Sequence, residues 1–298
     1  EGPDAVMVVM PSDHIIKDDG KFVEAVRRAA SVAQTGRLVL FGIKPDAPQT
    51  GFGYIRQGTA LDGFGGGAFK VQAFVEKPDR KTAQSYLAAG GYFWNSGIFV
   101  LHVKTFLDEL KRLEPRVLEA ARGGLEMAEE DLGFLRLDRA SFAASPSISI
   151  DYAVMEKTEA CAMLPIDVGW NDIGSWASLW DVAPHDADGN FVNGDAIMID
   201  TRDSYVHSER SLVATIGVEN LIIVDTPDAL LVADKSRSQD VSKIVGQLKL
   251  SNRKEQEQHL RNYRPWGFFE TLSISSRFQV KLLHVMPGAK LSMQMHHH

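Results

Sequence analysis

The sequence predicts an α/β protein with a mostly parallel sheet, followed by a small β-rich domain and a third, strand-rich segment. Two apolar runs of strand length, residues 5–10 and 38–43, flank a stretch in which apolar residues recur at helical spacing. A strand, a helix and a strand joined by short links form a βαβ unit, which implies a parallel sheet. Beyond Pro184 the long helical patterns give way to short β-like runs, which indicates a second domain.

The composition is that of an ordinary globular protein, with 44% hydrophobic and 24% charged residues among 298. The 32 basic and 39 acidic residues give a net charge of −7, and no basic block is present that would bind nucleic acid. The sequence contains no stretch of about 18 apolar residues, so we expect no membrane span. The single cysteine, Cys161, excludes an internal disulfide framework, and its apolar neighbours indicate a core thiol. We therefore expect a cytoplasmic protein.

The first domain is predicted over residues 1–183. Its first helix carries Phe22, Val26 and Ala29 on one face, with Asp18 or Asp19 as its cap. The later elements of this domain are predicted as strands over residues 69–76 and 97–102, a helix over 79–89 with Asp79 as its cap, two helices within 105–130, and a short helix that begins near Asp151.

The second domain is predicted over residues 184–250. Its strands are expected at residues 196–199, 212–216, 221–224 and 230–233, with a helix at 239–248 and no internal repeat. Residues 251–262 are polar and charged and predict a linker. The third segment, residues 263–298, contains an alternating pattern that predicts strands, at Phe278, Val280, Leu282 and His284.

Charged residues follow two of the predicted strands in the first domain. Ligands of open α/β sheets bind outside the carboxyl ends of the strands, which is where Asp13 leaves the first strand. Glu76 and Lys77 end a later strand, and this pair suits a sugar phosphate: the carboxylate accepts hydrogen bonds from hydroxyls and the ammonium meets the phosphate. The alternative for Glu76 and Lys77 is a solvated surface pair. Gly51 and Gly53 either let the backbone approach a ligand or form a turn.

Several short motifs occur in an order that one known family shares. They are PSDH (residues 11–14), GFGYI (51–55), FVEKP (74–78), WNSGIF (94–99), SIDYAVMEK (149–157) and GWNDIGSW (169–176). Together they resemble the mannose-1-phosphate guanylyltransferases, and among these the bifunctional bacterial enzymes. The later motifs YRPWG (263–267), RFQVK (277–281) and PGAKLSMQMHHH (287–298) resemble the start of the C-terminal mannose-6-phosphate isomerase domain of those enzymes, a cupin-type β-barrel.

The resemblance implies a Rossmann-like nucleotide-diphospho-sugar transferase domain, a small β-rich domain and the beginning of a cupin. It implies that GMP passes from GTP to mannose-1-phosphate, giving GDP-mannose and pyrophosphate for polysaccharide biosynthesis. An oxygen of the sugar phosphate is already anionic, so no activating base is required, and Mg²⁺ neutralises charge at phosphorus. The intact protein would also interconvert mannose-6-phosphate and fructose-6-phosphate with a divalent metal in the cupin.

The resemblance also assigns individual residues. It makes Asp13 and Asp172 the carboxylates that bind Mg²⁺, which prefers a few hard oxygen donors. Either residue could instead be a turn or cap residue. The sugar-phosphate residues that it implies share one pocket: Glu76 for the hydroxyls, Lys77 for the phosphate, Asn95 and Gly97 in the lining, and Gly53 and Tyr54 in support through backbone contacts.

Other residues of the motifs receive no role from the resemblance. Asp151 and Lys157 lie in SIDYAVMEK, and packing or helix capping would explain them equally well. His296 and His298 could bind a metal in an intact cupin, or belong to a purification tag.

The chain also departs from the family pattern at both ends. The family's N-terminal strand, with its Gly-rich loop and an Arg for the GTP phosphates, is not in this sequence, and the cupin stops where its histidines begin. We therefore expect a fragment cut at both ends that is inactive by itself. Two alternatives stay open: another sugar-1-phosphate nucleotidyltransferase, or a non-catalytic sugar-phosphate-binding protein. We expect neither nucleic-acid nor membrane partners, and a homo-oligomer stays open.

Overall fold

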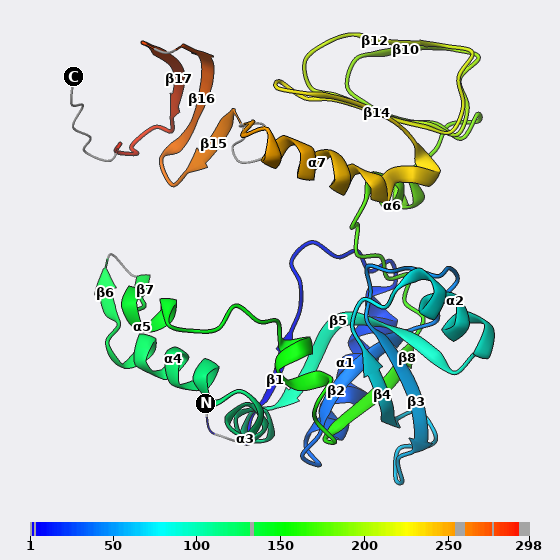
Figure 1. Ribbon diagram of the computed structural model, residues 1–298, viewed down its shortest axis with the longest axis vertical. Coiled ribbons are helices and arrows are strands. Elements are labelled where there is room, and N and C mark those ends of the chain that lie inside the picture. Colours follow the sequence, from blue (N-terminus) through cyan, green and yellow to red (C-terminus); the bar gives the residue numbers. More distant parts are fainter. Residues whose placement is uncertain (1, 3, 132–133, 254–259, 276, 292–298) are drawn as a thin grey trace. The chain divides into compact units, whose positions relative to one another are not determined.

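The computed structural model describes residues 2, 4–131, 134–253, 260–275 and 277–291 (Figure 1). The chain forms two compact units, Glu1–Asp172 and Ile173–His298. Among the described residues, no helix has both the length and the apolar character to cross a membrane.

The first unit combines one large sheet with several helices. Its strands are β1 (Val6–Val9), β2 (Leu38–Ile43), β3 (Tyr54–Ala60), β4 (Phe69–Val75), β5 (Tyr92–His102), β6 (Glu129–Asp131), β7 (Phe134–Arg136) and β8 (Cys161–Ile166). Its helices are α1 (Asp19–Ala33), α2 (Arg80–Ala89), α3 (Val103–Leu113), α4 (Pro115–Glu126) and α5 (Arg139–Ala143), with a π-helical turn at Asp151–Met155. The predicted α/β class is confirmed.

The sheet is more mixed than the predicted, mostly parallel one. Six described strands pair in the order β1-β5-β2-β8-β4-β3, and β3 also pairs with β5. Strands β2 and β8 pair in parallel, but β5 lies antiparallel between β1 and β2. Strands β1 and β2 still run in one direction, as a βαβ unit requires. The sequence did not reveal that β5 lies between β1 and β2. Most of β5 is buried, and a buried apolar run can form a parallel or an antiparallel strand.

Alternating side chains of β2 hold two helical layers against the sheet. Val39 and Phe41 pack on one face in a cluster with helix α1, whereas Leu38 and Leu40 face the other side, in a cluster that includes residues of α3, α4 and the π-turn. This alternation is the period of two expected of a strand. Cys161 is buried in the second cluster, as predicted for a core thiol, and burial raises its pKa to about 12.

Both predicted helix caps in this unit are present. Asp18 accepts a hydrogen bond from the Lys21 N–H at 2.9 Å, and Asp79 accepts one from the Thr82 N–H at 2.7 Å. Each bond satisfies an amide that would otherwise have no partner in the first helical turn. The hairpin of β6 and β7 and the short helix α5 follow α4 and were not predicted, because their apolar residues form no clear periodic pattern.

The second unit consists mainly of short strands. They are β9 (Phe191–Asn193), β10 (Ala196–Ile199), β11 (Tyr205–Ser208), β12 (Val213–Ile216), β13 (Leu221–Asp225), β14 (Leu230–Asp234), β15 (Arg261–Arg264), β16 (Gly267–Ile274) and β17 (Gln279–Val285). The helices are α6 (Trp176–Val182), a 3₁₀ helix at Lys235–Asp240, and α7 (Val241–Leu250). Strands β15, β16 and β17 form an antiparallel sheet of their own.

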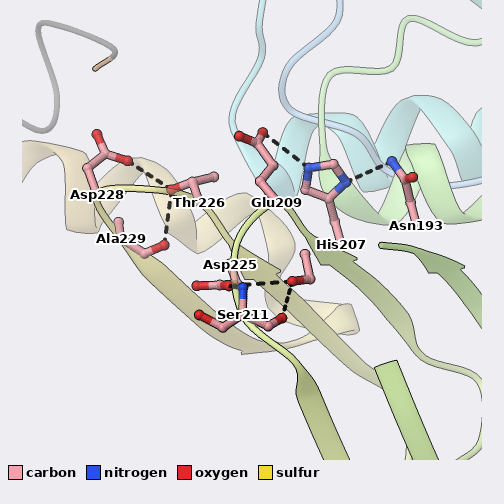
Figure 2. A network of polar contacts seen from close by, with 9 residues as sticks. Asn193, His207, Glu209, Ser211, Asp225, Thr226, Asp228 and Ala229 are labelled. Atoms are coloured by element: carbon pink, nitrogen blue, oxygen red, sulfur yellow. Dashed lines mark hydrogen bonds and ion pairs between the residues drawn. The ribbon is translucent and has the colours of Figure 1, made fainter. Parts of the chain in front are cut away.

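The strands between β9 and β13 stack as rungs. β11 pairs in parallel with both β9 and β13, and β10 pairs in parallel with β12. The pairs Ala196–Val213 and Tyr205–Ile222 have the same offset along the chain, so the structure contains a repeat that no sequence repeat reveals. Figure 2 shows a polar contact between two rungs: the His207 ring of β11 lies 3.0 Å from the Asn193 amide of β9. The other ring nitrogen lies 3.3 Å from Glu209, two residues further along the chain.

Candidate functional site

The Glu76–Lys77 pair follows β4 at a sharp change of backbone direction. Lys77 has a φ of 48°, a conformation uncommon outside glycine, and its N–H donates to the Phe52 carbonyl at 3.2 Å. The Lys77 ammonium lies 3.3 Å from Glu76 Oε1. The lysine side chain is 58% exposed and the glutamate only 8%, so the pair presents a buried acceptor beside an accessible cation.

The Glu76 carboxyl has an unused acceptor. Its Oε2 is buried and has no hydrogen-bond partner among the described residues. Burial raises the pKa of this carboxyl, and the negative charge of Asp151 raises it further. A buried acceptor without a partner is costly, and native proteins keep such atoms where a ligand or water completes them. Oε2 can therefore accept a hydrogen bond from a ligand hydroxyl.

Gly53 lies against this carboxyl. A Cβ at position 53 would overlap Glu76 Oε2, and would lie 3.1 Å from Phe74 Cζ and 3.3 Å from Asn95 Cβ. The glycine therefore makes room for the glutamate. Its neighbour Tyr54 is fully buried, and the Tyr54 hydroxyl donates to the Gln49 carbonyl at 2.9 Å. The backbone of Tyr54 pairs with Trp94 of β5, next to Asn95.

Asn95, in the middle of β5, connects several parts of the site. Its N–H donates to the Gly53 carbonyl at 2.8 Å, and its Oδ1 accepts from the Gly97 N–H at 3.2 Å. Its Nδ2 donates to Asp151 Oδ1 at 3.0 Å. Gly97 has a φ of 71°, and a Cβ there would meet His14 Cε1 at 3.6 Å. The loop that carries Asp13 therefore lies against β5 close to Asn95.

The segments that carry Asp13 and Asp172 are joined by an isolated antiparallel bridge. The Ile15 N–H donates to the Asn171 carbonyl at 2.8 Å, and the Asn171 N–H donates back at 2.9 Å. The His14 ring packs edge-on against Trp170 with centroids 5.4 Å apart, and Trp170 Nε1 donates to His14 Nδ1 at 3.2 Å. The two aspartates thus lie on adjacent segments although the sequence separates them widely.

Aromatic rings connect the two halves of the site. Phe52 contacts Trp94 with centroids 5.1 Å apart, and it contacts Trp170 at 5.6 Å. Since Trp170 also holds His14, the rings run from the glutamate side of the site to the aspartate side. Such edge-on contacts stabilise by about 0.5–1.5 kcal/mol each beyond their buried area. The tryptophans of two motifs, Trp94 and Trp170, are therefore linked through Phe52.

The residues present fit a magnesium ion with few protein ligands. Asp13 and Asp172 supply hard carboxylate oxygens, and Mg²⁺ commonly takes one or two carboxylates and fills the remaining positions with water and phosphate oxygens. Over the part of the chain that the structure describes, no group of three or more His, Cys, Asp or Glu side chains could hold a metal. His296 and His298 lie outside the described residues.

Two carboxylates at the site were not assigned from the sequence. Asp151 binds Asn95, as above, and Glu156 Oε1 accepts from the Glu76 N–H at 2.8 Å. Burial raises the pKa of Asp151. The available signal was a pair of acidic residues within one family motif, but only the folded chain shows that both face β4 and β5. Lys157, in contrast, forms an ion pair with Glu114 at 2.6 Å.

Comparisons with known proteins match three family models to successive parts of the chain. Residues 1–189 match the family model described as nucleotidyl transferase, residues 194–248 the MannoseP isomerase/GMP-like beta-helix domain, and residues 251–298 the mannose-6-phosphate isomerase C-terminal family. The fold and the first match define the class, an α/β transferase. The chain belongs to the nucleotidyl transferase family.

Three relatives make the comparison more specific. The chain is 48% identical over 297 residues to the xanthan biosynthesis protein XanB of Xanthomonas campestris pv. campestris (strain B100), covering 100% of this chain and 62% of that protein. It is 47% identical over 296 residues to a mannose-1-phosphate guanylyltransferase of Escherichia coli (strain K12), covering 99% and 62%. The crystal structure of mannose-1-phosphate geranyltransferase from Thermus thermophilus aligns with a TM-score of 0.69 and 32% identity, covering 82% of this chain and 70% of that one.

These matches confirm the resemblance to mannose-1-phosphate guanylyltransferases that carry an isomerase domain. The chain spans 62% of the length of the two curated relatives.

Proposed function

We propose that the full-length protein transfers GMP from GTP to mannose-1-phosphate, giving GDP-mannose and pyrophosphate. The observation that carries this proposal is the buried, unpartnered Glu76 Oε2 beside the exposed Lys77 ammonium, in a chain of the nucleotidyl transferase family. The carboxylate accepts hydrogen bonds from the sugar hydroxyls, and Lys77 holds the sugar phosphate. Asn95 supplies further polar contacts in the same pocket.

The reaction requires alignment more than acid or base catalysis. An oxygen of mannose-1-phosphate attacks the α-phosphorus of GTP, a new P–O bond forms, and the bond to the pyrophosphate leaving group breaks. The attacking oxygen is already anionic, so no residue has to remove a proton from it. Lys77 orients that phosphate, which converts a two-substrate encounter into a positioned one. Asp13 and Asp172 would hold Mg²⁺, which supplies positive charge against the charge that develops at phosphorus.

The assay is release of pyrophosphate from GTP in the full-length protein, with and without mannose-1-phosphate. Glu76→Ala should raise the KM for mannose-1-phosphate more than the KM for GTP, and Asp172→Asn should increase the Mg²⁺ concentration needed for half-maximal rate. Turnover that neither substitution changes would refute the residue assignment. Faster turnover with another nucleoside triphosphate or another sugar phosphate would favour a sibling nucleotidyltransferase. Binding of mannose-1-phosphate without turnover would favour a non-catalytic binding protein.

The match of residues 251–298 to the isomerase family favours a second activity. We propose that the full-length protein also interconverts mannose-6-phosphate and fructose-6-phosphate with a divalent metal, for which His296 and His298 are ligand candidates. His296→Ala should abolish isomerisation and leave pyrophosphate release unchanged. An isomerase rate that His296→Ala leaves intact would refute that ligand. Because GTP is an intracellular nucleotide and one cysteine occurs in 298 residues, we also propose a cytoplasmic location.

A further inference from the structure

The π-helical turn at Asp151–Met155 lies directly behind the proposed sugar-phosphate site. Its defining hydrogen bond runs from the Glu156 N–H to the Asp151 carbonyl, five residues back, at 2.9 Å. In an α-helix, residues five apart point about 140° away from each other, at 3.6 residues per turn. The wider π turn brings such residues closer to one face. Single π turns are rare and occur frequently at functional sites.

The apolar residues of the turn fix it in the core. Ala153, Val154 and Met155 are buried in the same cluster as Leu38 and Met163 of the sheet. The acidic residues at the two ends of the segment, Asp151 and Glu156, instead bond to β5 and to the end of β4. The turn therefore anchors on the sheet through its centre and reaches the site through both of its ends.

Asp151 determines the orientation of the Asn95 amide. The Gly97 N–H can only donate, so the Asn95 atom 3.2 Å from it is the oxygen. An ionised carboxylate can only accept, so the Asn95 atom 3.0 Å from Asp151 Oδ1 is the nitrogen. A flip of the amide would lose both bonds at once. Asp151 thus holds Asn95 in one of its two orientations.

Glu156 acts on Glu76 rather than on Asn95. Its Oε1 accepts from the Glu76 N–H at 2.8 Å, one residue before the left-handed conformation of Lys77. Fixing this amide fixes where the Glu76 side chain leaves the backbone. Through this hydrogen bond, Glu156 helps to set the direction in which the buried Glu76 carboxyl points.

We propose that the π turn is a positioning element of the sugar-phosphate site, in which Asp151 holds the Asn95 amide and Glu156 holds the main chain at Glu76. The inference rests on the proposed function and extends it to two residues that act through others. The charged groups that face Glu76 are Lys77, Asp151 and Glu156. Removing the charge of Asp151 should therefore also change how Glu76 titrates.

The test compares Asp151→Ala and Asp151→Asn in the full-length protein, with Lys157→Ala as a matched control from the same segment. Asp151→Ala should raise the KM for mannose-1-phosphate about 10-fold, the loss expected for a hydrogen bond to a charged group, with little change in the KM for GTP. Asp151→Asn keeps an acceptor for Asn95 and should recover most of that loss. Lys157→Ala should leave both KM values unchanged, because the Lys157 ammonium pairs with Glu114, at the junction of α3 and α4.

A pH profile separates positioning from general stability. Burial and the Asp151 charge both raise the pKa of Glu76, so its carboxylate form is lost as the pH falls through that raised pKa. In Asp151→Asn the acid limb of kcat/KM for mannose-1-phosphate should move to lower pH. An unmoved acid limb, or Asp151→Asn as impaired as Asp151→Ala, would overturn the inference.

A readout without turnover separates this inference from the proposed function. In urea unfolding, Asp151→Ala should cost less in an Asn95→Ala background than in the wild type, because the bond is already lost. Additive costs would overturn the inference whatever the enzyme does. Absence of GDP-mannose synthesis by the wild type would instead contradict the proposed function alone, provided that calorimetry still detects mannose-1-phosphate and that Asp151→Ala weakens its binding.

Discussion

Replacement of Gly53 by alanine tests whether position 53 must be glycine for the Glu76 carboxyl to fit beside it. The φ of Gly53 is not in the left-handed region, so the backbone itself tolerates alanine. The new Cβ, however, would overlap Glu76 Oε2 and press on Phe74 and Asn95 at 3.1 and 3.3 Å. Phe74 and Asn95 are both buried and have little freedom to move. We therefore expect the Glu76 carboxyl to be displaced.

The magnitude follows from the cost of overpacking a well-packed site, about 1–3 kcal/mol for one added carbon. If that cost falls on the geometry that binds the sugar phosphate, affinity for mannose-1-phosphate should fall about 5- to 150-fold. Affinity for GTP should change little. Isothermal calorimetry of the full-length protein with each ligand separately measures both values.

Gly51→Ala is the matched control, because a Cβ at Gly51 has no atom within 4 Å and its φ is also outside the left-handed region. Equal affinities of Gly53→Ala and Gly51→Ala for mannose-1-phosphate would refute the reasoning. A second check uses unfolding free energies: Gly53→Ala should cost less in a Glu76→Ala background, where the overlapping oxygen is absent. An undiminished cost there would assign the effect to Phe74 or Asn95 instead.

Further predictions concern stability and reactivity. Because the pKa of Glu76 is raised in the folded state, the folded protein binds this proton more tightly than the unfolded chain, and the group's contribution to stability falls as pH rises through the raised pKa. Glu76→Gln should therefore stabilise the unliganded protein at neutral pH by about 1 kcal/mol, which would raise the melting point by about 2–4 °C. This gain in stability should vanish under acidic conditions. A lower melting point of Glu76→Gln at neutral pH would contradict the prediction. Because its pKa is raised to about 12, the buried Cys161 thiol should not react with a thiol reagent at neutral pH until denaturant is added. Fast labelling of the native protein would contradict this prediction, because it would mean that the core around Cys161 is accessible to the reagent.

The sequence predicted those parts of the fold that depend on local patterns. The caps Asp18 and Asp79, strand β2 and the four short runs of the second unit are set by residue type and by neighbours within a few positions. The antiparallel place of β5 depends on pairing between distant strands, and nothing within the run itself encodes it.

The candidate site divides in the same way. The sequence alone predicts Asp13, Glu76 and Lys77 as ligand-binding candidates, because each follows a predicted strand. Asp151 and Glu156 could not be assigned from the sequence, because their roles depend on a π turn and on hydrogen bonds to residues far away in the chain. These distant bonds complete the surroundings of Glu76 and Asn95.

A crystal structure of the full-length protein with mannose-1-phosphate tests the central claim most directly. The account predicts a sugar hydroxyl within hydrogen-bond distance, about 2.5–3.0 Å, of Glu76 Oε2, and the phosphate on the Lys77 ammonium. Oε2 would then have the partner that no described residue supplies. A sugar phosphate bound elsewhere, with Glu76 Oε2 still lacking a donor, would contradict the account.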